Sequence, residues 1–70
     1  MYYKWFPDAG NRSNYVRMKD HVCVGHIHLV RGDALPWRGT IYNEFSTTRS
    51  HLILCAQTEQ AIKMAMELTL

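Results

Sequence analysis

The sequence predicts an α+β domain in which an antiparallel sheet of three to four strands packs against one C-terminal helix. Two observations predict this class. Runs rich in β-branched and aromatic residues, separated by turn formers, fill residues 15–56 and are typical of strands. Residues 58–69 instead place apolar side chains three and four positions apart, which is typical of a helix that buries one face. A chain of 70 residues has a small core, so we expect residues 1–70 to form a single domain.

Residues 1–14 are predicted to be an aromatic segment followed by an exposed loop. The segment from Tyr2 to Phe6 is rich in aromatic residues, which suits either a short strand or an apolar anchor. Residues 7–14 concentrate Pro, Asp, Gly, Asn and Ser, which favour turns and oppose a helix. The continuous strands are therefore expected from Tyr15 onward.

The clearest strand is predicted from His21 to Arg31. Strict alternation places His26 and His28 on one face of it. The same alternation places Cys23 and Gly25 on the other face. Gly25 lies near the middle of this long run and predicts a bulge or a bend.

Two further strands are predicted. Residues 37–43 resume the alternation after a turn, with Trp37 on one face and Arg38 and Tyr42 on the other. Residues 51–56 are apolar at both alternating sets of positions. That pattern suits a central strand or one close to the covering helix.

The C-terminal helix has the strongest local signals. Thr58 suits its N-terminal cap, because the hydroxyl can accept a hydrogen bond from a free backbone N–H group of the first turn. Glu59 follows at the end where the helix dipole favours an acid. The stripe expected to face the sheet consists of Ala61, Ile62, Ala65, Met66 and Thr69. So short a helix needs the sheet for its stability.

The residue content argues against several chemistries. Cys23 and Cys55 lie in apolar runs and are predicted to be buried free thiols, with a disulfide between them as the alternative. His26 and His28 have a spacing that can serve a metal, but no acidic residue or paired-cysteine motif accompanies them, so we expect no metal and no cofactor. The sequence also lacks a glycine-rich phosphate loop and a paired-carboxylate motif. We therefore expect no enzymatic activity.

The expected function is binding to another protein. The sequence holds many large rings for so small a core, so some of them are expected to face solvent, and Trp, Tyr and Arg dominate interface energies. The net charge is +2, and seven of the eight basic residues lie between Lys4 and Arg49, which suits a moderately acidic partner surface. The predicted partner-binding residues are Trp5, Arg31, Trp37, Arg38, Tyr42 and Arg49.

The segment from Glu59 to Glu67 reads Glu-Gln-Ala-Ile-Lys-Met-Ala-Met-Glu. It resembles the closing helix of some small phage anti-CRISPR proteins, which also combine a β-sheet with one helix. The resemblance covers only this segment and rests on composition, so it transfers no functional residue. It implies an inhibitor, encoded by a phage or mobile element, that binds a host defence complex in the host cytoplasm.

Two alternatives stay open at this level. An aromatic and basic sheet face suits a small nucleic-acid-binding domain, although the final helix carries one Lys against two Glu. Edge strands and an uncovered sheet face suit a homodimer or a subunit of a larger assembly. The sequence shows neither a signal peptide nor a run near the roughly 18 apolar residues of a membrane helix, so we expect a cytoplasmic protein without a membrane partner.

Overall fold

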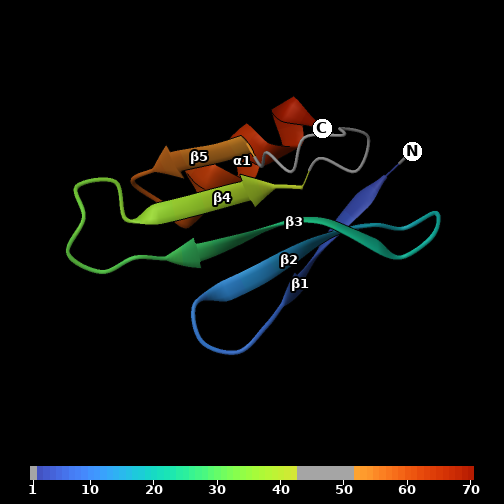
Figure 1. Ribbon diagram of the computed structural model, residues 1–70, viewed down its shortest axis with the longest axis horizontal. Helices are drawn as coiled ribbons and strands as arrows, with labels where there is room; N and C mark the ends of the chain where they lie inside the picture. The colour runs from blue at the N-terminus through green and yellow to red at the C-terminus, as the bar shows by residue number, and fades with distance from the viewer. Residues whose placement is uncertain (1, 43–51) are drawn as a thin grey trace.

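The computed structural model describes residues 2–42 and 52–70, which form an antiparallel sheet and a helix (Figure 1). The elements in chain order are β1 (Tyr3–Pro7), β2 (Arg12–Arg17), β3 (Val22–Leu29), β4 (Trp37–Ile41), β5 (Leu52–Ala56) and α1 (Glu59–Thr69). Each strand pairs with the next one along the chain, so the sheet is a meander in the order β1-β2-β3-β4-β5. The α+β class is confirmed, and the sheet has five strands rather than three to four.

Half of the predicted N-terminal loop is strand, since Pro7 ends β1 and residues 12–14 belong to β2, whereas residues 8–11 form a turn as predicted. β2 begins at Arg12, inside residues 7–14 that were expected to be a loop. The turn before it contains Gly10, whose φ of 69° suits a residue without a side chain. Ser13 is buried and lies opposite Ile27 of β3. Pairing with β1 on one side and β3 on the other makes a strand of residues whose local composition favours a turn.

The predicted bulge lies in the pairing of β2 with β3. Tyr15 of β2 lies opposite Gly25, whereas the next β2 residue, Val16, lies opposite Cys23. Val24 is the extra residue of β3 at this point. The assignment of the β3 residues before Gly25 to the two faces of the sheet, as the alternation predicted it, is therefore wrong. Cys23 shares the face of Val16, because one extra residue shifts a period of two by one position.

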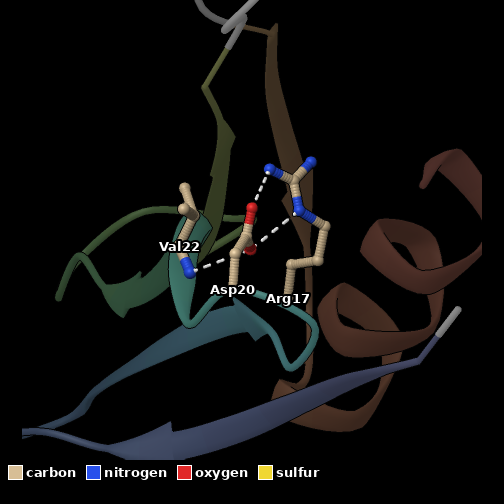
Figure 2. A network of polar contacts seen from close by, with 3 residues as sticks. All are labelled: Arg17, Asp20 and Val22. Atoms are coloured by element: carbon tan, nitrogen blue, oxygen red, sulfur yellow. Dashed lines mark hydrogen bonds and ion pairs between the residues drawn. The ribbon is translucent and has the colours of Figure 1, made fainter.

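A polar network closes the turn between β2 and β3 (Figure 2). Arg17 at the end of β2 forms a two-pronged ion pair with Asp20, with Nε–Oδ1 and Nη2–Oδ2 distances of 3.0 and 2.8 Å. The same carboxylate accepts a hydrogen bond from the backbone N–H of Val22, where β3 begins. The hydrogen bond from Arg17 is the largest cause that lowers the pKa of Asp20. The network thus joins the end of one strand to the start of the next, directly before the bulge.

The helix α1 packs over β4 and β5 (Figure 1). Thr58 caps it as predicted, since its hydroxyl accepts a hydrogen bond from the Ala61 N–H at 3.1 Å. Within the predicted stripe, Ile62 and Met66 are fully buried, but Ala61 and Thr69 are exposed. The stripe is narrower than predicted because the helix meets the sheet along one line of side chains.

The buried core combines two sheet residues and two helix residues: Ile27, Ile41, Ile62 and Met66. Two glycines of the sheet make room for the helix. A Cβ atom on Gly25 would lie 2.8 Å from the terminal methyl of Met66, and one on Gly39 would lie 2.8 Å from its sulfur. A larger residue at Gly39 would press on Met66 and Ile62 of α1, and one at Gly25 would also collide with the backbone carbonyl of Thr40 at 2.5 Å.

Candidate functional site

The candidate site is the face of the sheet opposite α1, which we call the open face. A Cβ atom built onto Gly25 or Gly39 would lie close to Met66, so these two positions belong to the face that the helix covers. Side chains alternate between the two faces along each strand. Within residues 2–42 and 52–70, no element packs on the opposite side of the sheet. The residues that alternate with these glycines therefore form the open face.

A row of basic side chains crosses the centre of the open face. Arg12 of β2 lies opposite His28 of β3, and His28 lies opposite Arg38 of β4. Neighbouring strands are about 4.8 Å apart, so the three backbone positions span about 10 Å. The two guanidinium groups offer N–H donors and positive charge, and the imidazole adds a further hydrogen-bonding group, an arrangement that suits carboxylate or phosphate ligands.

Tyr42 connects this row to His26. The Tyr42 hydroxyl lies 2.5 Å from His26 Nδ1, and Arg12 donates a hydrogen bond to the same oxygen. Burial is the largest cause that raises the pKa of Tyr42, the neighbouring Cys23 adds to it, and Arg12 acts in the opposite direction. The hydroxyl is therefore protonated at neutral pH. It donates to Nδ1 when the neutral His26 ring carries its proton on Nε2, and it accepts from Nδ1 in the other tautomer.

An alkaline titration is expected to detect this environment. Burial raises the pKa of both Tyr15 and Tyr42 above the ordinary value of 10.0. Both phenols hold their protons more tightly in the folded chain, so their contribution to stability is complete below pH 10.0. That contribution to stability is lost as the pH rises through the pKa values that the two phenols have in the folded chain. The Tyr42→Phe variant should lack one late-titrating phenol in an ultraviolet absorbance titration and should lose less stability at alkaline pH. A titration curve equal to that of the unmodified chain would contradict the Tyr42 contacts.

Two buried polar atoms of this row, one of them on Arg38, have no hydrogen-bond partner among the described residues. The Nη2 of Arg38 pairs with Asp33 Oδ2 at 2.5 Å. Its Nε has no partner among the described residues, and neither has Nδ1 of His28 across the row, although both atoms are shielded from solvent. The backbone N–H of Leu35 is the largest cause that lowers the pKa of Asp33, followed by Arg38. The ion pair between Arg38 and Asp33 also shows that a carboxylate can approach this guanidinium, here from the connection between β3 and β4.

Apolar side chains flank the basic centre on both sides. Phe6 of β1 and Ile53 of β5 are the two ends of a second row, which runs through Asn14, His26 and Thr40. Phe6 is 42% exposed and Ile53 is 60% exposed. The open face therefore offers apolar contact groups at its margins and hydrogen-bond donors at its centre.

The five predicted partner-binding residues that the structure describes do not share one surface. Arg38 and Tyr42 lie on the open face, as the alternation predicted. Arg31 is exposed in the connection between β3 and β4. Arg49 lies outside the described residues. The two tryptophans lie elsewhere, on the helix side.

Trp5 and Trp37 are partly buried against the core. The Trp5 ring stacks on Tyr15 with a centroid separation of 4.3 Å, and its Nε1 donates a hydrogen bond to Glu67 at 3.0 Å. The Lys63 ammonium lies 5.5 Å from the centre of the Trp5 ring. These contacts join β1 to α1, so packing alone accounts for the position of Trp5.

Sequence reasoning missed Arg12 and assigned no role to His26 and His28. The alternation did place both histidines on one face. Arg12, however, was predicted to lie in a loop, and only the strand register places it opposite His28. No local signal in the sequence indicates that pairing.

Both thiols lie on the open side of the sheet and are free. Cys23 is half-buried and its Sγ lies 3.2 Å from the carbonyl oxygen of Gly25. Cys55 is exposed, so its predicted burial is wrong. It belongs to β5, the last strand of the sheet in the described part of the chain, where the face opposite α1 is uncovered. Among the residues that the structure describes, no three His, Cys, Asp or Glu side chains are grouped so that they could hold a metal ion.

Comparison of the chain with protein-family models, with curated proteins and with solved structures found no match. Within the described ranges, no helix has the length and apolar character needed to cross a membrane; α1 has 11 residues. The candidate site is therefore argued from the geometry of this chain alone.

Proposed function

We propose that this chain is a small non-enzymatic module that binds an acidic protein surface through its open face. The observation that carries the proposal is the row of Arg12, His28 and Arg38 on a face that no described element covers. Arginine binds carboxylates through parallel hydrogen bonds, which gives direction as well as attraction. Tyr42 adds a further residue type that contributes strongly at protein interfaces.

Three features favour a protein over a nucleic acid. Both tryptophans, the strongest candidates for stacking on bases, lie on the helix side. The net charge is only +2, which is low for a domain that neutralises several phosphates. Phe6 and Ile53 flank the basic centre and suit the apolar groups of a protein surface.

We further propose that binding inhibits the partner. A module without a catalytic constellation acts by occupying a surface that its partner needs. The resemblance of residues 59–67 to the closing helix of anti-CRISPR proteins supports a phage or mobile-element inhibitor, active in the host cytoplasm against a defence complex. Addition of the purified chain to a CRISPR effector cleavage assay tests this part, and uninhibited cleavage by every effector of the host would reject it.

The binding proposal is tested with a paired set of variants. The double variant Arg38→Glu and Tyr42→Ala removes two central contacts, and Lys19→Glu reverses the charge of an exposed residue in the turn between β2 and β3. In a quantitative pull-down from host cells, the unmodified chain and Lys19→Glu should enrich the same protein. The double variant should enrich it at least tenfold less, which corresponds to about 1.4 kcal/mol of binding free energy. Equal enrichment by all three would contradict a role for the open face.

A nucleic-acid-binding domain is the second candidate function, supported by the cations Lys4, Arg12 and Arg38 together with the His26 and Tyr42 rings. Fluorescence anisotropy with a labelled single-stranded oligonucleotide separates the two candidates. We expect no binding that survives physiological salt. Tight binding at low salt that falls steeply as salt is added, and that the Arg38→Glu and Tyr42→Ala double variant abolishes, would favour this second function.

A further inference from the structure

The two edges of the sheet differ in their protection against pairing with another chain. β1 carries Lys4 and Pro7, and both residue types oppose the addition of a further strand. β5 reads Leu-Ile-Leu-Cys-Ala and has neither charge nor proline. In the described part of the chain, β5 pairs with β4 on one side and has no strand on the other. The β5 edge therefore offers backbone hydrogen-bonding groups in an apolar setting.

Exposed apolar side chains gather beside this edge. Leu52 and Ile53 point to opposite faces of β5 and are 49% and 60% exposed. On α1, Met64 and Leu68 lie one turn apart and are 54% and 86% exposed. Four of the eight large apolar side chains that the structure describes as exposed thus belong to β5 and α1 at one end of the sheet.

One of these helix side chains, Leu68, lies on the flank of α1 that is turned toward the β5 edge. Lys63 and Glu67 contact Trp5, so this flank of α1 faces the β1 end of the sheet. Leu68 lies on the opposite flank of the buried line that Ile62 and Met66 form, because a helix turns by about 100° per residue. The charged flank is therefore turned away from the β5 edge and the flank that carries Leu68 toward it, whereas Met64 lies opposite the buried line and points away from the sheet.

We infer that a second copy of this chain binds the β5 edge, with the two β5 strands antiparallel across a two-fold axis. A two-fold axis pairs an edge with the same edge, and the absence of charge from Leu52 to Ala56 means that self-pairing brings no like charges together. An acidic partner would instead seek cations, and those of the open face lie on other strands, at Arg12 and Arg38. The apolar, uncharged edge matches its own copy better than it matches the partner of the open face.

Such a dimer has a ten-stranded continuous sheet, since each copy contributes the five strands of its described part. The two helices lie on the same face of this sheet and the two open faces lie side by side on the other. The β5 edge shares Ile53 with the margin of the open face, but it contains none of Arg12, His28 and Arg38, and Leu68 lies on the helix side, so either proposal can fail without the other. The contact uses two short strands and two helix flanks, which is a small interface, and we expect an association that depends on concentration.

Sedimentation equilibrium of the full chain, from roughly 1 to 300 μM, tests the inference. We expect a monomer at the low end and a dimer at the high end. Leu68→Glu, at a side chain that makes little contact within the fold, and Ile53→Lys, which places a lysine on the edge strand, should each shift dimer formation to at least tenfold higher concentration. Phe6→Lys on β1 is the matched control and should leave the dimer unchanged. Circular dichroism checks that each variant is folded.

Hydrogen exchange measured at both concentrations locates the contact. Amides of Leu52–Ala56 should exchange more slowly at high concentration, whereas those of Tyr3–Pro7 should exchange at the same rate. A chain that stays monomeric throughout the range overturns the inference. So does a dimer that Phe6→Lys disrupts and Leu68→Glu does not, or one that protects β1 rather than β5.

Discussion

Replacement of Met66 by alanine is expected to lower the free energy of unfolding by about 3 kcal/mol, a large part of the stability of a domain this small. Met66 is fully buried and contacts the sheet where Gly25 and Gly39 leave room for it. Its removal opens a cavity between α1 and the sheet, and the two glycines have no side chains that could fill it. Urea denaturation followed by circular dichroism measures the effect.

Met64→Ala is the matched control for this prediction. The same two residue types are exchanged in the same helix, two positions away, but Met64 is 54% exposed. Its replacement should change the free energy of unfolding by less than about 0.5 kcal/mol. Equal losses for Met64→Ala and Met66→Ala would show that α1 does not pack on the sheet through the line of Ile62 and Met66.

The Gly25→Ala variant is expected to lose about 3 kcal/mol for the opposite reason, because it adds an atom where none fits. The new Cβ would lie 2.5 Å from the backbone carbonyl oxygen of Thr40 and 2.8 Å from the Met66 methyl. The methionine end can move, but the carbonyl belongs to β4 and cannot move without a shift of the strand. The strain therefore falls on the β3–β4 pairing as well as on the helix contact.

Gly10→Ala separates this packing effect from the general cost of replacing glycine. Gly10 has a positive φ of 69°, and a Cβ atom added to it would meet no neighbouring atom within 4 Å. Its replacement therefore costs only the backbone strain of about 1 kcal/mol. Gly25 has no positive φ. A loss at Gly25 no larger than that at Gly10 would contradict the close approach of β3 and β4 beneath the helix.

The candidate site shows where sequence reasoning reaches its limit. The alternation in residues 37–43 correctly placed Arg38 and Tyr42 on one face, because side-chain direction in a strand follows from position alone. Trp5, which was predicted as a partner-binding residue together with them, lies on the other side of the sheet, where its ring packs against Tyr15 of β2 and Glu67 of α1. Arg12 was absent from the predicted set because the composition of residues 7–14 predicted a loop there. Its position opposite His28 depends on a register that no local pattern encodes.

By itself, the sequence determined the features that depend on neighbouring residues. Thr58 starts the helix, the spacing of Ile62 and Met66 selects its buried line, and Gly25 allows the bulge in β3. The tertiary structure decided how many strands there are and which side chains meet on the open face. The physical reason is that a strand such as Arg12–Arg17 is stabilised by its partners across the sheet rather than by its own residues, so its existence and its register appear only when β1 and β3 pair with it.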